Sequence, residues 1–200
     1  SSDLSAFLPF LPITALQLLL LNLLYDILCM TLPWDRVDAD VYEKPSEWSG
    51  KILGRFMRFF GPLSSLFDLA TFAFLYFILC PALLGDNFTE LSSAMQSQFA
   101  ILFHTGWFLE SMWTQVLILP LLRPKQLSIL RSRASGVVWL VTSAGLLILT
   151  AIVYTPAAHL LGLAPLPLWY FGFLAVTILA YMLLVTAAKR WYIQKYHTLL

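Results

Sequence analysis

The sequence contains few charged residues for its length. Only 12% of its 200 residues are charged, whereas 60% are hydrophobic and the mean hydropathy is +0.79. A soluble domain is about one quarter charged and about half apolar, so this composition excludes an ordinary soluble protein and indicates a polytopic membrane protein. The formal net charge of +1 gives no basis for binding nucleic acid.

Cysteine and histidine are also scarce. Cys29 and Cys80 lie in apolar runs, so we expect two buried free thiols rather than a disulfide or a metal site. His104 has no His or Cys companion, which makes a metal-ligand role a poor interpretation. The sequence opens without a Met or a basic segment, so we expect no signal peptide and expect further helices upstream.

Long apolar stretches are abundant. Five of them contain about 20 residues or slightly more, which is enough for a helix to cross a bilayer. Strand-like alternation is absent from the sequence, so a barrel is not expected. We predict an all-α membrane protein in which residues 1–200 form a single transmembrane domain, a five-helix bundle. The predicted spans are about 13–32, 59–83, 99–122, 136–155 and 168–188.

The basic residues predict the orientation. All 12 Lys and Arg residues fall in segments 33–58 and 123–135 and at the C-terminal end, and segments 84–98 and 156–167 contain none. With five spans, the basic segments share one side, which the positive-inside rule makes cytoplasmic. We therefore expect a periplasmic N-terminus and a cytoplasmic C-terminus.

Prolines mark two predicted helix starts. Pro9 and Pro12 predict a tight turn before the first span, because a regular helix loses backbone hydrogen bonds at proline. Pro62 fits the first turn of the second span, where Ser64 or Ser65 would satisfy free amides.

The first span carries an oxygen-rich spot. Asn22 and Asp26 are four residues apart and share one face of the predicted helix, with Tyr25 beside them and Gln17 nearer one end. A carboxylate at membrane depth costs several kcal/mol and is usually functional. We expect Asp26 and Asn22 to bind a metal ion; the alternative is a protonated Asp26 that hydrogen-bonds across a helix interface.

Four further polar residues are candidates for an ion pathway: Tyr25, Asp68, Glu110 and Gln115. Asp68 lies about two turns into the second span, where a structural carboxylate bonding a neighbouring helix is the favoured interpretation. Glu110 falls near the middle of the third span, with Ser111, Thr114 and Gln115 as a polar flank. A Glu at this depth is a cation ligand, a proton carrier or a structural hydrogen-bonding group.

The segment 33–58 has two interpretations. It contains five acids and five bases and the tryptophans Trp34 and Trp48. The first interpretation is a solvated loop anchored at the interface by these tryptophans. The second is a docking surface for a cytoplasmic domain.

The stretch from Gln17 to Asp26 resembles the sixth transmembrane helix of P-type cation-transporting ATPases, whose ion-site motif is an Asn followed four residues later by an Asp. The resemblance is sharpest toward the magnesium-importing branch of that family. The matching segments are 6–12 (AFLPFLP), 22–26 (NLLYD), 33–35 (PWD), 44–45 (KP), 54–57 (GRFM), 61–62 (GP), 64–65 (SS), 67–68 (FD), 106–108 (GWF) and 189–190 (KR).

This resemblance implies the last five helices of a ten-helix, ATP-driven magnesium pump of the bacterial inner membrane. Mg²⁺ would be the transported ion. The partners would be the lipid bilayer, the pump's N-terminal helices and its cytoplasmic domains. The family's phosphorylation motif, Asp-Lys-Thr-Gly-Thr, is absent from these 200 residues. ATP is therefore expected to act only through other domains, and the chain alone is not expected to hydrolyse it. Pro120, Pro124 and residues 1–5 depart from the family pattern.

Two other functions stay open at this point. One is a non-enzymatic five-helix membrane protein that binds or regulates an intact cation pump. The other is a proton-coupled carrier that uses Asp26 and Glu110.

Overall fold

The computed structural model describes residues 9–31, 50–121 and 136–196. The described residues form helices and no strands, which confirms the prediction of an all-α fold. The elements are α1 (Ala15–Thr31), α3 (Gly50–Phe74), the π-helical turn η3 (Leu75–Leu79), α4 (Cys80–Leu84), α5 (Ser93–Leu121), α6 (Gly136–Ile152), the 3₁₀ helix η5 (Pro156–Leu161) and α7 (Leu168–Tyr196).

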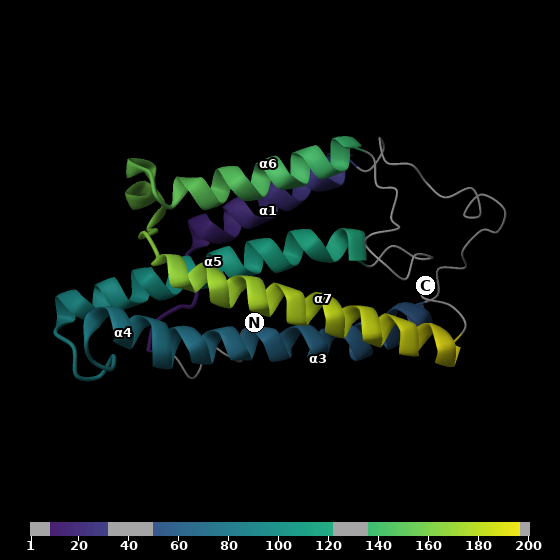
Figure 1. Ribbon diagram of the computed structural model, residues 1–200, viewed down its shortest axis with the longest axis horizontal. Coiled ribbons are helices and arrows are strands. Elements are labelled where there is room, and N and C mark those ends of the chain that lie inside the picture. Colours follow the sequence, from purple (N-terminus) through teal and green to yellow (C-terminus); the bar gives the residue numbers. More distant parts are fainter. Residues whose placement is uncertain (1–8, 32–49, 122–135, 197–200) are drawn as a thin grey trace.

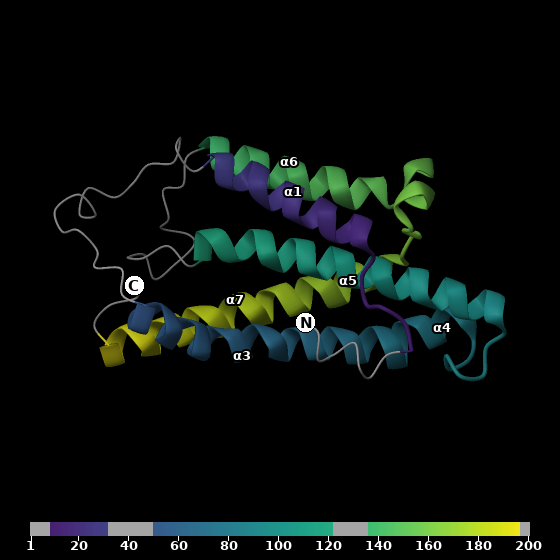
Figure 2. The ribbon, with the colours of Figure 1, turned by 180° about the vertical axis from the view of Figure 1, so that it is seen from behind.

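The helices run roughly side by side in three layers (Figure 1). α1 and α6 pack against each other on one side of α5, and α3 packs against α7 on the other side. α5 contacts both pairs and therefore forms the middle layer. Figure 2 shows the same order from behind. At one end of the molecule, the start of α3 meets the end of α7, where the rings of Phe60 and Tyr192 are 5.9 Å apart.

The middle position of α5 explains its burial. Phe99, Phe103, Leu109 and Met112 are fully buried, and so is Glu110. The helices of the outer layers, α1, α3 and α7 among them, instead expose many large apolar side chains. A helix that is apolar on every face is typical of the centre of a bundle or of a membrane span.

α5 approaches the layer of α3 and α7 closely at Gly106. A Cβ atom at this position would lie 2.4 Å from Cδ2 of Leu75, which is itself fully buried in η3. The Tyr170 hydroxyl, from α7, donates a hydrogen bond of 2.6 Å to the Gly106 carbonyl. Three helices therefore meet at one glycine, and the contact leaves no room for a side chain.

The π-helical turn begins at the same place. The Cys80 amide bonds to the Leu75 carbonyl, five residues back, and Pro81 follows directly. Proline cannot donate to the carbonyl four residues earlier and its ring crowds that carbonyl, which accounts for a widened turn just before it. The turn brings Leu75 and Leu79, both fully buried, onto α5.

The residues before α1 are bent rather than helical, as predicted around Pro9 and Pro12. Phe10 packs its ring against Phe88, Phe99 and Phe103, with ring centroids 5.2–6.1 Å apart. A ring nitrogen of His104 hydrogen-bonds to the Leu11 carbonyl, so His104 is a structural residue that holds this segment on α5.

The expected placement of Pro62 in the first turn of the second helix is wrong. α3 begins at Gly50, so Pro62 lies inside it rather than in its first turn, and part of segment 33–58 is helical. A proline inside a helix costs about 3 kcal/mol. Packing on α7 offsets this cost on both sides of Pro62, through Phe60 on Tyr192 and Phe67 on Tyr181. The rest of that segment lies outside the described residues.

Two helical stretches are long and apolar enough to cross a membrane, Phe60–Leu84 and Leu168–Tyr192. They match the predicted spans 59–83 and 168–188. Ala15–Met30 and Val138–Ile152 are shorter apolar helices within the predicted spans 13–32 and 136–155. Both cysteines are free, Cys80 buried and Cys29 half-buried.

Gly106→Ala should destabilise the chain by about 1–3 kcal/mol, because the added methyl must displace a buried leucine. The matched control is Gly172→Ala on α7, where a Cβ would meet nothing within 4 Å. That change should be neutral or stabilising by up to about 1 kcal/mol, since alanine favours a helix. Denaturant titration in mixed micelles, followed by circular dichroism, measures both. Equal stability of the two variants would contradict this packing.

Candidate functional site

The Asn22–Asp26 pair lies on an exposed face of α1. Both side chains are exposed, and Tyr25 beside them is half-buried. The buried face of the helix carries Leu21 and Leu24, which are 6% and 7% exposed. At about 100° per residue, Asn22 and Asp26 point away from that buried face. They therefore point away from the layers that the structure describes.

Polar anchors fix the orientation of α1. The fully buried amide of Gln17 donates to the carbonyls of Leu161 and Gly162, at 3.3 and 3.1 Å. The side-chain oxygen of Gln17 accepts a hydrogen bond from the backbone N–H of Thr14. In return, the Thr14 hydroxyl accepts one from the backbone N–H of Gln17. Farther along, Leu24 packs so closely on Gly145 of α6 that a Cβ there would lie 2.7 Å from it. These contacts hold the Asn22–Asp26 face outward.

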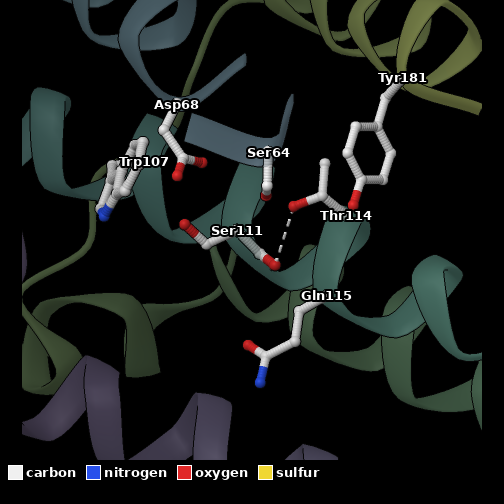
Figure 3. Close-up of a pocket in the computed structure, with 7 residues that line it drawn as sticks. All are labelled: Ser64, Asp68, Trp107, Ser111, Thr114, Gln115 and Tyr181. Carbon is white, nitrogen blue, oxygen red and sulfur yellow. Dashed lines mark hydrogen bonds between the residues drawn. The ribbon is translucent and has the colours of Figure 1, made fainter. Parts of the chain in front are cut away.

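A second polar region lies on the other side of α5. A cavity of about 300 Å³ opens between α3, α5 and α7. Figure 3 shows Asp68 and Ser64 of α3 facing the polar residues of α5, while Tyr181 reaches in from α7. Its lining side chains are Ser64, Asp68, Trp107, Ser111, Thr114, Gln115 and Tyr181.

Hydrogen bonds and stacking position this lining. The Thr114 hydroxyl donates to the backbone carbonyls of Glu110 and Ser111, at 2.9 and 3.3 Å. Tyr181 of α7 packs edge-to-face on Phe67 of α3, with ring centroids 5.3 Å apart. Trp107 stacks on Phe72 of α3, with ring centroids 4.3 Å apart. The cavity wall is thus tied to all three helices.

Glu110 lies behind this wall. It is fully buried, and neither of its carboxylate oxygens has a hydrogen-bond partner within the described part of the chain. It interacts electrostatically with Asp68, which lines the cavity. Leaving a buried polar group unpaired is costly, and the cost is greatest for a charge.

The helix register places a second unpaired group, the Thr71 hydroxyl, opposite Glu110. α3 and α5 run antiparallel, and Leu75 packs on Gly106. In this antiparallel register, Thr71 is four residues before Leu75 and Glu110 is four residues after Gly106. Thr71 therefore faces Glu110. The Thr71 hydroxyl is fully buried and also has no hydrogen-bond partner in the described residues. The α3–α5 contact therefore buries several oxygens that the described side chains do not satisfy.

The structure thus divides the predicted site residues into two groups. Asp68 and Gln115 line the cavity and Glu110 lies next to it, whereas Asn22, Asp26 and Tyr25 are on α1 and do not line it. Sequence reasoning missed Thr71 and Tyr181 as polar partners of this region. Thr71 is three residues after Asp68, a spacing that indicates a shared helix face, but nothing in the sequence pairs α7 with α3. No three His, Cys, Asp or Glu side chains gather anywhere in the described residues.

Comparison with known proteins identifies the family. The model of the family described as cation transporting ATPase, C-terminus, matches residues 10–191. The chain belongs to this family. The prediction from the motifs around Asn22 and Asp26 is confirmed at this level.

The relatives of this chain include proteins whose name is magnesium-transporting ATPase. The chain is 39% identical over 192 residues to "Magnesium-transporting ATPase, P-type 1" of Salmonella typhimurium. It is 36% identical over 192 residues to the protein of the same name in Escherichia coli K12. Each match covers 96% of this chain and 20% of the relative, so the chain spans about a fifth of the relatives' length.

Spin labels on α1 test the outward orientation of the Asn22–Asp26 face. Asp26→Cys should give a mobile nitroxide spectrum, because this position is exposed. Leu28→Cys should give an immobilised spectrum, because this side chain is only 2% exposed. The native thiols are first removed with Cys29→Ala and Cys80→Ala. An immobilised label at position 26 would place that face inside the bundle and contradict the structure.

Proposed function

We propose that this chain is the membrane-embedded ion-translocation part of a magnesium-importing P-type ATPase. The observation that carries the proposal is the placement of an Asn and an Asp, one turn apart, on the exposed face of a helix in a chain of this family. The names of the relatives supply the ion, Mg²⁺. ATP hydrolysis belongs to other parts of the longer protein.

The chemistry of the pair suits magnesium. Mg²⁺ prefers oxygen ligands in near-octahedral geometry and gives up its waters reluctantly. Asp26 offers a carboxylate, and Asn22 offers a carbonyl that stays neutral at every pH. Two oxygens from one helix leave the other coordination positions to water and to ligands from other helices. The outward direction of this face leaves it free to meet such helices.

The cost of the exposed carboxylate supports a functional role. A charged side chain at membrane depth costs several kcal/mol unless it is compensated. In this proposal the compensation comes from the ion and from helices supplied by the rest of the pump. Residues 1–200 form one transmembrane domain, with α1, α3–η3–α4, α5, α6 and α7 as its five spans.

We further propose that the N-terminus is periplasmic and the C-terminus cytoplasmic, in the bacterial inner membrane. The basic start of α3, with Arg58, and the basic end of α7, with Arg190, lie at the same end of the molecule. A single basic end is what the positive-inside rule requires of the cytoplasmic side. In this proposal, segment 33–58 is a cytoplasmic segment that would contact the catalytic domains.

The test replaces the matching segment of the Escherichia coli relative with this chain and then introduces Asp26→Asn. The change keeps the size of the side chain and one oxygen but removes the charge. Magnesium-stimulated ATPase activity should fall to background, while expression and membrane insertion stay at the level of the parent chimera. Asp86→Asn, at an exposed acid between α4 and α5, is the matched control and should retain activity. Full activity of Asp26→Asn with unchanged magnesium dependence would remove Asp26 from the site.

A further inference from the structure

The cavity between α3, α5 and α7 is separated from the Asn22–Asp26 face by the whole width of α5. Its wall presents hydroxyl oxygens, the Gln115 amide and the Asp68 carboxylate (Figure 3). We propose that this cavity binds one hydrated divalent cation, at a site independent of Asn22 and Asp26. The choice of a divalent ion rests on the proposed function; the existence of the site does not.

The charges favour a cation. Asp68 lines the cavity, and Glu110 lies close enough behind it to interact electrostatically. The lining residues include no Lys or Arg, and both Glu110 oxygens lack a hydrogen-bond partner among the described residues. A cation in the cavity would compensate the Asp68 carboxylate and would favour the ionised form of Glu110 behind it.

The size and the lining chemistry favour an ion that keeps its waters. The described residues contain no cluster of three acidic, His or Cys ligands that would replace a hydration shell. Six waters occupy about 180 Å³ in the liquid, at about 30 Å³ each, so a hexahydrated ion fits the cavity of about 300 Å³. Waters on a cation donate hydrogen bonds. Asp68, Ser111 and Gln115 offer the oxygens that accept them.

The unpaired groups behind the wall fit the same arrangement. Glu110 and Thr71 are buried without hydrogen-bond partners among the described residues, and Asp68, three residues before Thr71 on α3, lines the cavity. Water held by a bound ion would form hydrogen bonds with these buried oxygens and with the side chains that line the cavity. A polar cavity of this size has room for water, whereas genuinely empty cavities are apolar.

The test titrates Mn²⁺, a divalent ion that is visible by electron paramagnetic resonance, into the purified 200-residue chain in micelles, with Mg²⁺ as competitor. Wild-type chain should bind one Mn²⁺ that Mg²⁺ displaces. Asp68→Asn should weaken binding roughly 10–100-fold, the range for groups that hold a metal through its outer shell. Glu110→Gln should also weaken Mn²⁺ binding. Ser111→Ala is a milder change that tests the wall without removing a charge, and it should also weaken binding.

Controls separate this site from the α1 site. Asp86→Asn, at an exposed acid away from the cavity, should bind Mn²⁺ like the wild type, and Asp26→Asn should keep the cavity-bound Mn²⁺ that Asp68→Asn weakens. Circular dichroism confirms that each variant keeps its helix content. Binding that survives Asp68→Asn, or that is lost in Asp26→Asn alone, would overturn this site while leaving the proposed role of Asp26 standing. The absence of saturable Mn²⁺ binding, with an infrared band of a neutral carboxylic acid that disappears in Glu110→Gln, would also overturn it, because Glu110 would then be neutralised by a proton.

Discussion

The close approach of α5 to η3 at Gly106 is the constraint on which the rest of the structure depends. A backbone without a side chain lets Leu75 pack directly on α5, and the Tyr170 hydroxyl ties the same carbonyl to α7. Small residues at a helix crossing let backbones approach closely, which increases the van der Waals packing that helps to hold helices together in lipid. Around this point, α5 is covered by the other helices on both sides.

This crossing also sets the polar chemistry. With Leu75 fixed on Gly106, the antiparallel register brings Thr71 opposite Glu110 and carries Asp68 to the α5 residues one turn farther on. On the other side of α5, α1 turns Gln17 inward and leaves Asn22 and Asp26 outward. The same middle helix thus separates two oxygen-rich regions, one enclosed by this chain and one that faces outward.

The positions of the apolar helices and the residues that share a helix face could be predicted from the composition and periodicity of the sequence. Apolar runs located α1 and α6 to within a few residues, whereas α5 begins at Ser93 and α7 ends at Tyr196, outside the predicted spans 99–122 and 168–188. The start of α3 was missed because the cost of Pro62 is local, whereas the aromatic contacts with α7 that offset it are not visible in a single sequence. The i, i+4 spacing placed Asn22 and Asp26 on one face, and the family motifs identified the chain. The π-helical turn and the meeting of Asp68 with Gln115 and Tyr181 depend on tertiary packing, so local patterns could not give them. The metal-ligand role of Asn22 and Asp26 stays a prediction.

A double-mutant cycle between Gly106 and Leu75 tests this constraint most directly. The cycle compares the free energies of unfolding of Gly106→Ala, Leu75→Ala and the double variant in mixed micelles. If the two residues are in contact as described, the added methyl fills space that the shortened leucine leaves. The double variant should then be more stable than the sum of the single changes by about 0.5–3 kcal/mol. Additivity within about 0.3–0.5 kcal/mol, the behaviour of distant sites, would contradict the account.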